Sequence, residues 1–149
     1  MKSHRIVIVL LVVLAAALAG GQMVTRPFHN GSVWTITFIR THAGMDNAYL
    51  SYLTTDWKRE QEAMKQEGII LSYKVLATEP HATADFNIML MTEYKDLATM
   101  EANEAKADAL GQKLFGSDEK IQQGYKNRSE MRDVLGDRLA REIILEPKK

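Results

Sequence analysis

The stretch VWTITFIR, residues 33–40, decides the fold that this sequence predicts. It consists almost entirely of β-branched and aromatic residues, which is typical of a strand. Side chains alternate along a strand, so Trp34, Ile36 and Phe38 share one face and Ile39 lies on the other. Because both faces carry bulky apolar groups, we expect this strand to be covered on both sides.

Three more strands and three helical segments are predicted after this stretch. Alternating apolar residues predict the strands, which cover residues 69–78, 85–94 and 138–146. Apolar residues at helical spacing predict the helices, which cover residues 46–67, 95–114 and 117–135. The order is β-α-β-β-α-β with the second helix extended or split, which is the ferredoxin-like arrangement. The predicted fold class is therefore α+β, a four-stranded antiparallel sheet with helices on one face.

The first predicted helix has one apolar stripe, formed by Leu50, Leu53, Trp57 and Met64. Gly68 follows it at the position where a left-handed residue commonly ends a helix. The stripe predicts which side of this helix packs against the sheet.

One layer of helices cannot cover both faces of the predicted sheet. Met89 and Met91 in the third strand point to the side opposite Ile88, and bulky groups occupy both faces of the first strand. An apolar face without cover indicates an interaction surface. The simplest cover is a second copy of the chain around a two-fold axis, which predicts a homodimer through the open sheet face.

These elements resemble the dimeric α+β-barrel superfamily over residues 33–147. The likeness rests on residues 33–40, YLSYLTTDWK at 49–58, GIILSYKV at 68–75 and IMLMTEY at 88–94. The pattern is most similar to small exported members whose activity is not assigned. Other members include cofactor-free quinol oxygenases, haem-degrading oxygenases, muconolactone isomerases and chlorite dismutases, so the fold alone selects no reaction.

The resemblance implies a ligand pocket between the sheet and the first helix, or near the barrel mouth. The candidate catalytic residues are His42, Arg40 and Tyr73, and the candidate pocket residues are Trp34, Tyr49, Trp57 and Met91. The expected function is small-molecule binding, with an apolar ligand and no assigned reaction. A cofactor-independent monooxygenase or isomerase is the alternative, and it predicts that four of these side chains, His42, Arg40, Trp57 and Tyr73, converge on one cavity.

His42 follows the first strand and lies close to Arg40 in sequence. An imidazole there could act as a base or bind haem iron, and an arginine beside a helix N-terminus could hold an anion. A haem-binding protein using His42 or His81 is a further alternative. The competing interpretation of His42 is a solvated turn histidine. For Trp57 the competing interpretation is packing in the core, and for Tyr73 it is a buried position in the sheet.

Several classes of site lack their signature. No histidine pair has metal-binding spacing and the chain has no cysteine, so neither a metal nor another cofactor is predicted. No nucleophile elbow, phosphate loop or dinucleotide fingerprint is present. Nineteen basic residues balance nineteen acidic ones, which gives no electrostatic reason to expect nucleic acid as a partner.

Residues 1–19 have the three parts of a secretory signal. Lys2 and Arg5 form a basic start, residues 6–19 are apolar, and small residues precede a cleavage site after Ala19. Residues 20–32 then form a linker, in which Asn30 begins a glycosylation sequon, and residues 33–147 form the domain. We expect a secreted or periplasmic protein. The alternative is an uncleaved membrane anchor, although a spanning helix needs about 20 apolar residues.

Overall fold

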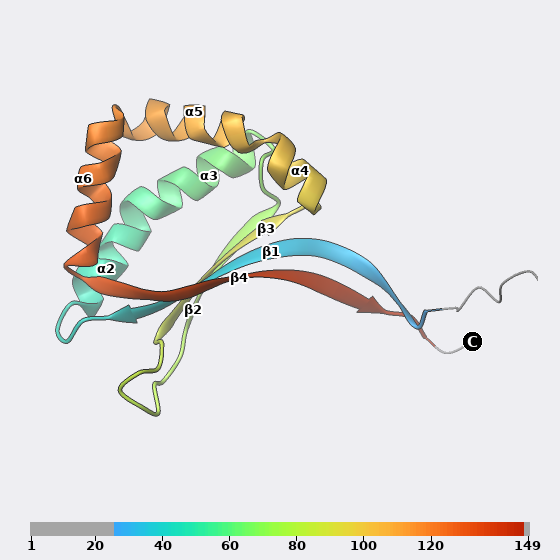
Figure 1. Ribbon diagram of the computed structural model, residues 1–149, viewed down its shortest axis with the longest axis horizontal. Helices are drawn as coiled ribbons and strands as arrows, with labels where there is room; N and C mark the ends of the chain where they lie inside the picture. Colours follow the sequence, from blue (N-terminus) through green and yellow to red (C-terminus); the bar gives the residue numbers. More distant parts are fainter. Residues whose placement is uncertain (1–25, 148–149) are drawn as a thin grey trace, which may run out of the picture. The chain divides into compact units, whose positions relative to one another are not determined.

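The described part of the chain, residues 26–147 of a computed structural model, contains a sheet of four strands (Figure 1). The elements are β1 (Phe28–Thr41), β2 (Ser72–Ala77), β3 (Ile88–Tyr94) and β4 (Arg132–Leu145). Their order across the sheet is β2-β3-β1-β4, and each neighbouring pair is antiparallel. The predicted α+β class with a four-stranded antiparallel sheet is therefore confirmed. The predicted signal, residues 1–19, lies outside the described residues.

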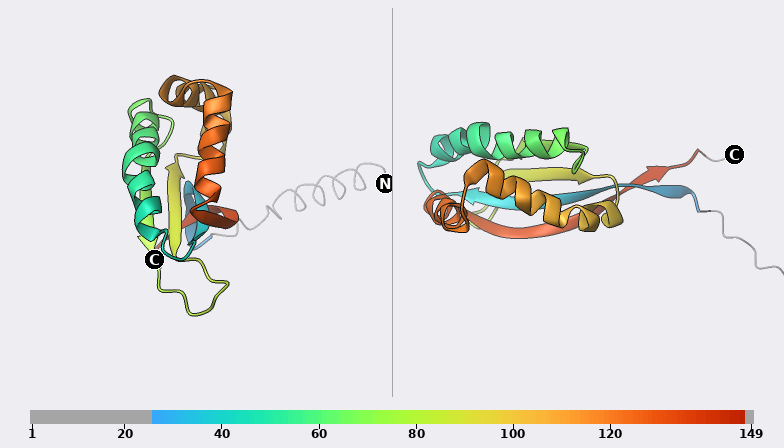
Figure 2. Two further views of the ribbon diagram at one scale, coloured as in Figure 1. Left: turned by 90° about the vertical axis from the view of Figure 1, so that its left-hand side faces the viewer. Right: turned by 90° about the horizontal axis from the view of Figure 1, so that it is seen from above.

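All the described helices lie on one face of this sheet (Figures 1 and 2). Between β1 and β2 run α2 (Asp46–Tyr52), the π-helical turn η1 (Leu53–Trp57) and α3 (Lys58–Gln66) without a break. Between β3 and β4 run α4 (Leu97–Ala102), α5 (Glu104–Phe115) and α6 (Asp118–Ser129). The second helical segment is therefore split, as the sequence allowed, and its first helix begins where the Asp96 carboxylate accepts the backbone N–H of Thr99 at 2.7 Å.

The helix-covered face holds the core. Ile39 of β1 and Ile88 of β3 lie opposite each other and form the buried cluster with Tyr49 and Leu53 from the first helical segment. Farther along β3, the Thr92 hydroxyl donates to the side-chain oxygen of buried Gln61 at 3.0 Å. The first helical segment is therefore fixed to the two central strands.

The other face of the sheet has no helix over it in the described residues (Figure 1). The β1–β3 register places Ile36 opposite Met91 and Phe38 opposite Met89, all half-buried, with Trp34 next along β1. We call these five residues the open sheet face. The predicted division of the first strand into two apolar faces agrees with this register.

Leu50 was expected to be buried, and this expectation is wrong. Leu50 is 44 % exposed, whereas its neighbour Tyr49 is fully buried. A row of residues four apart, from Tyr49 through Leu53 to Gln61, faces the sheet. In an ordinary α-helix, residues four apart rotate gradually around the helix axis and away from one face. The π-helical turn η1 has more residues per turn, which reduces this rotation and keeps the row on the side that faces the sheet. Gly68 ends the segment at φ +69°, as predicted.

The start of every strand differs from the sequence-based expectation. β2 begins at Ser72 and β3 at Ile88, each three residues later than predicted. β4 begins at Arg132, so Leu135 lies in a strand and not in a helix. Gly136, at φ +154°, does not stop a helix; it adjoins a register shift in β4 opposite Phe38, where a bulge requires an unusual backbone. β1 begins at Phe28 because β4 continues far enough to pair with it, so residues 28–32 are strand where linker was expected.

Candidate functional site

The seven predicted site residues do not surround one cavity. They form three groups, which are Arg40 with His42, Tyr49 with Trp57 and Tyr73, and Trp34 with Met91. The first group lies at one end of the sheet, the second lies beneath the helices, and the third lies on the open sheet face. Arg40 and Tyr73 belong to opposite faces of the sheet by register.

The first group is completed by Asp133, which the sequence analysis placed in a helix. Asp133 lies opposite Arg40 in the β1–β4 register. Its Oδ2 accepts from the Arg40 guanidinium at 2.8 Å, and its Oδ1 lies 3.2 Å from His42 Nε2. The other ring nitrogen, Nδ1, lies 3.0 Å from the backbone oxygen of Glu130. We call Arg40, His42 and Asp133 the charge cluster.

Both ring nitrogens of His42 face acceptors, a carboxylate and a carbonyl, so both can donate only when the imidazole is protonated. The hydrogen bond to Asp133, aided by that to Glu130, accordingly raises the pKa of His42. The bonds from Arg40 and then His42 lower the pKa of the Asp133 carboxyl. In the protonated form, the imidazole of His42 has no free lone pair for a general base or for haem iron.

Arg40 also connects a third segment to the charge cluster. Its other guanidinium nitrogen donates to the backbone oxygen of Thr83, in the connection between β2 and β3, at 3.0 Å. The cluster therefore joins the end of β1, the start of β4 and this connection. His81 lies in the same connection with an exposed side chain.

The second group packs between the helices and the sheet. Tyr49 stacks on Tyr52 with ring centres 5.8 Å apart, and burial raises the pKa of its hydroxyl to about 12. Trp57 contacts Tyr73 edge to face at 5.3 Å. The Tyr73 hydroxyl donates to the Glu62 carboxylate, which raises the pKa of Tyr73 to about 12. Trp57 is half-buried and packs against the core, whereas the half-buried Tyr73 binds a carboxylate through its hydroxyl.

The third group lies in the open sheet face. Trp34 is half-buried and has the Lys74 amino group 5.1 Å from its ring centre. Lys74 is opposite Met91 in the β2–β3 register. The group therefore consists of apolar side chains bordered by charge.

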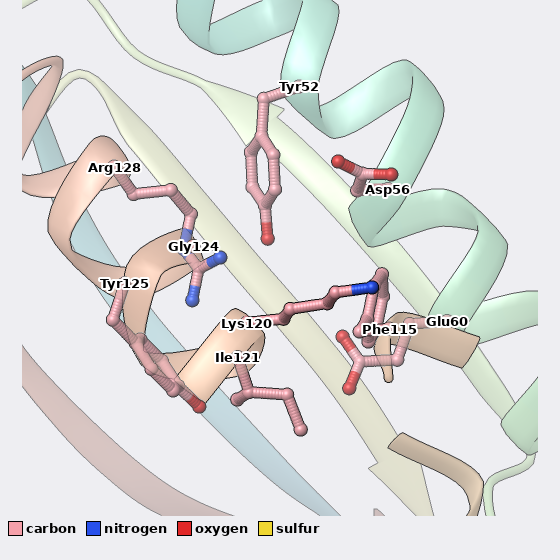
Figure 3. A pocket seen from close by; sticks show the side chains of 9 residues that line it. All are labelled: Tyr52, Asp56, Glu60, Phe115, Lys120, Ile121, Gly124, Tyr125 and Arg128. Atoms are coloured by element: carbon pink, nitrogen blue, oxygen red, sulfur yellow. The ribbon is translucent and has the colours of Figure 1, made fainter. Parts of the chain in front are cut away.

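A pocket that the sequence analysis did not identify lies between the first helical segment and α6 (Figure 3). Its volume is about 180 Å³. Its walls are formed by residues of η1, α3, α6 and the adjoining ends of α2 and α5, namely Tyr52, Asp56, Glu60, Phe115, Lys120, Ile121, Gly124, Tyr125 and Arg128. We call this the α6 pocket, and none of the seven predicted residues lines it.

Arg128 is one of the charged residues that line this pocket. Its guanidinium carbon lies 4.3 Å from the Tyr125 ring centre and 5.1 Å from that of Tyr52. A Cβ at Gly124 would lie 3.2 Å from an Arg128 nitrogen. The glycine inside a helix, normally unfavourable by about 1 kcal/mol, was the sequence signal that could have drawn attention to this helix.

Burial affects one further group in the α6 pocket. Desolvation raises the pKa of the Glu60 carboxyl, and the positive charge of Arg128 opposes that rise. Asp56 is already paired with Arg59 at 3.3 Å. Of the two carboxylates in the pocket, Asp56 is therefore ion-paired with Arg59, and Glu60 lies near the positive charge of Arg128.

Within residues 26–147, no helix is long and apolar enough to cross a membrane, and no cluster of three or more His, Cys, Asp or Glu residues could hold a metal.

Comparison with known proteins gives one structural likeness. No family model matches the chain, and no curated protein matches it. The chain is similar to the crystal structure of HapK from Hahella chejuensis, with a TM-score of 0.50 and 14 % identity. The likeness covers 74 % of this chain and 91 % of HapK. At this identity it supports an α+β fold shared with HapK and nothing about activity.

Proposed function

We propose that this chain is a ferredoxin-like domain that forms a homodimer of the α+β-barrel type and binds a small molecule. The observation that carries the dimer is the open sheet face, an apolar surface in the middle of the sheet. The order of strands and helical segments along the chain, β-α-β-β-α-β, and the strand order β2-β3-β1-β4 across the sheet support the ferredoxin-like topology.

The open sheet face has the composition of an interface. Its centre is aromatic and methionine-rich, and charged residues border it on both sides. Lys74 lies beside Met91 on the β2 side, and Arg138 lies beside Ile36 on the β4 side. An apolar centre with a polar rim is typical of association between proteins. A two-fold axis through the centre lets one face cover its own copy.

Light scattering on the purified protein at micromolar concentration tests the dimer. We expect the mass of two chains for the wild type and of one chain for Ile36→Lys, because the lysine would place a charge in the buried centre. Leu50→Lys is the matched control, since Leu50 is exposed on α2, and it should remain dimeric. A monomeric wild type, or equal dissociation of both variants, would contradict the proposal.

For the small molecule, we propose the α6 pocket as the site. Phe115, Ile121 and Tyr52 provide apolar surface for the body of the ligand. The monooxygenase or isomerase alternative predicted that His42 and Trp57 converge on one cavity, but they lie in separate groups, so we do not propose it. Haem binding through His42 is not proposed either, because both ring nitrogens of His42 face acceptors.

We also propose that the domain acts outside the cytoplasm, in the periplasm or as a secreted protein. The support is the signal-like pattern of residues 1–19. N-terminal sequencing of protein recovered from a bacterial periplasm should begin at Gly20, and membrane-bound, uncut protein would favour the anchor instead.

A further inference from the structure

We propose that the α6 pocket binds a small aromatic anion, whose carboxylate pairs with Arg128 and whose ring packs against Phe115 and Ile121. This inference rests on the proposed small-molecule function and specifies the class of ligand. It concerns side chains of a single chain and does not depend on the dimer.

The guanidinium of Arg128 is oriented by two aromatic rings, and its N–H groups have no hydrogen-bond acceptor among the described residues. Tyr52 and Tyr125 lie against it, which restricts its position, yet it makes no hydrogen bond or ion pair within the described residues. Stacking on aromatic rings leaves the N–H groups at the edge of the guanidinium plane free to donate. Figure 3 shows this group pointing into the pocket. A carboxylate is the partner that fits such a planar fork with two parallel hydrogen bonds.

Lys120 adds a second positive charge with no ion pair among residues 26–147. Its side chain extends across the pocket toward the first helical segment (Figure 3). Of the two acidic residues in the lining, Asp56 pairs with Arg59, and Glu60 lies near the positive charge of Arg128 without forming an ion pair with it. The N–H groups of Arg128 and Lys120 therefore have no carboxylate partner within residues 26–147, and they can bind an anion.

The apolar part of the pocket limits the size of the ligand. Phe115 is held by Arg59, whose guanidinium carbon lies 5.0 Å from the ring centre, and Ile121 lines the pocket from α6. A cavity of about 150 Å³ is known to hold one benzene ring. The volume of about 180 Å³ here suits a single ring with one or two small substituents.

A titration followed by amide NMR shifts tests the inference with 4-hydroxybenzoate as the probe and 4-hydroxybenzamide as its neutral counterpart. We expect the benzoate to shift the Gly124 amide and to bind at least ten times more tightly than the benzamide. Arg128→Gln should lose at least tenfold of the benzoate affinity. Lys126→Gln, which removes an exposed cation of the same helix outside the pocket, should leave the affinity unchanged.

Gly124→Ala provides a second variant in case Arg128→Gln unfolds the protein. Alanine favours the helix, but its methyl group would lie 3.2 Å from the guanidinium, so we expect a several-fold loss of benzoate binding in a folded protein. Equal affinity for both probes, no effect of either pocket variant, or shifts located elsewhere would overturn the inference.

The same titration separates this inference from the proposed function. Ile36→Lys should still bind the benzoate as a monomer, because one chain supplies the whole pocket. Equal binding of both probes at Gly124 would support a small-molecule pocket and overturn its preference for anions. A dimer that binds neither probe would overturn the inference and leave the proposed dimer unaffected. A wild-type monomer that binds the benzoate would contradict the proposed dimer and leave the inference unaffected.

Discussion

The two faces of the sheet carry similar side chains but differ in how they are covered. On β1, Val33 and Ile39 are 2 % and 0 % exposed beneath the helices, whereas Ile36 and Phe38 on the opposite side remain half-buried. Burial of apolar surface contributes about 25 cal/mol per Å² wherever it occurs. The helix-covered face therefore stabilises the single chain, and the open sheet face can contribute its full share only with a partner.

The largest expected effect separates the two faces directly. Ile39→Ala should lower the free energy of unfolding by about 2–5 kcal/mol, because it leaves a cavity in a closed core. Ile36→Ala should cost about 1 kcal/mol in the monomer, since its surroundings are partly solvent. Urea unfolding at protein concentrations where the dimer has dissociated measures both, and equal losses would show that the faces do not differ.

A smaller effect is expected at the polar contact inside the covered face. Thr92→Val removes the hydroxyl that donates to Gln61 and leaves the buried amide oxygen without its donor. We expect a loss of about 1–3 kcal/mol in the free energy of unfolding. The double variant Gln61→Leu, Thr92→Val should recover part of that loss in the same assay. A Thr92→Val protein as stable as the wild type would mean that water reaches this contact.

The smallest effect lies at the end of the sheet, in the charge cluster, and depends on pH. The pKa of His42 is raised above 6.5, so its stabilising contribution is complete below about pH 6.5 and is lost as pH rises through the folded pKa. The pKa of Asp133 is lowered below 3.8, so its contribution is present above that pH and is lost on further acidification.

Thermal unfolding of the wild type and His42→Gln across pH 5–9 measures the contribution of His42. The difference in Tm should be greatest near pH 5 and should shrink on the alkaline side. A difference that is constant with pH would argue against an imidazolium in the charge cluster.

Much of the fold could be predicted from short-range patterns. Alternation along residues 33–40 correctly divided β1 into two faces, and the position of Gly68 correctly ended the first helical segment. The errors arose where pairing between distant segments decided the outcome. Leu135 has a helical pattern around it, but pairing with the end of β1 draws that part of the chain into β4.

The candidate sites divide in the same way. The proximity of Arg40 and His42 is visible in sequence because they are two residues apart, but Asp133 reaches them only through the β1–β4 register. The residues that line the α6 pocket come from five elements, which are α2, η1, α3, α5 and α6. The spacing of apolar residues within α6 could indicate that the side of this helix carrying Ile121 is packed. That spacing carries no information about which residues of α3 face α6.

The sequence by itself determined the α+β class, the alternation of faces in the central strand and the helical segments between the strands, because these follow from backbone propensity and from spacing over a few residues. Only the tertiary structure decided that Tyr49 is buried in place of Leu50, that Asp133 holds His42, and that Arg128 lines a pocket. Those outcomes depend on the register between distant strands and on the packing of one helix against another, which local patterns do not specify.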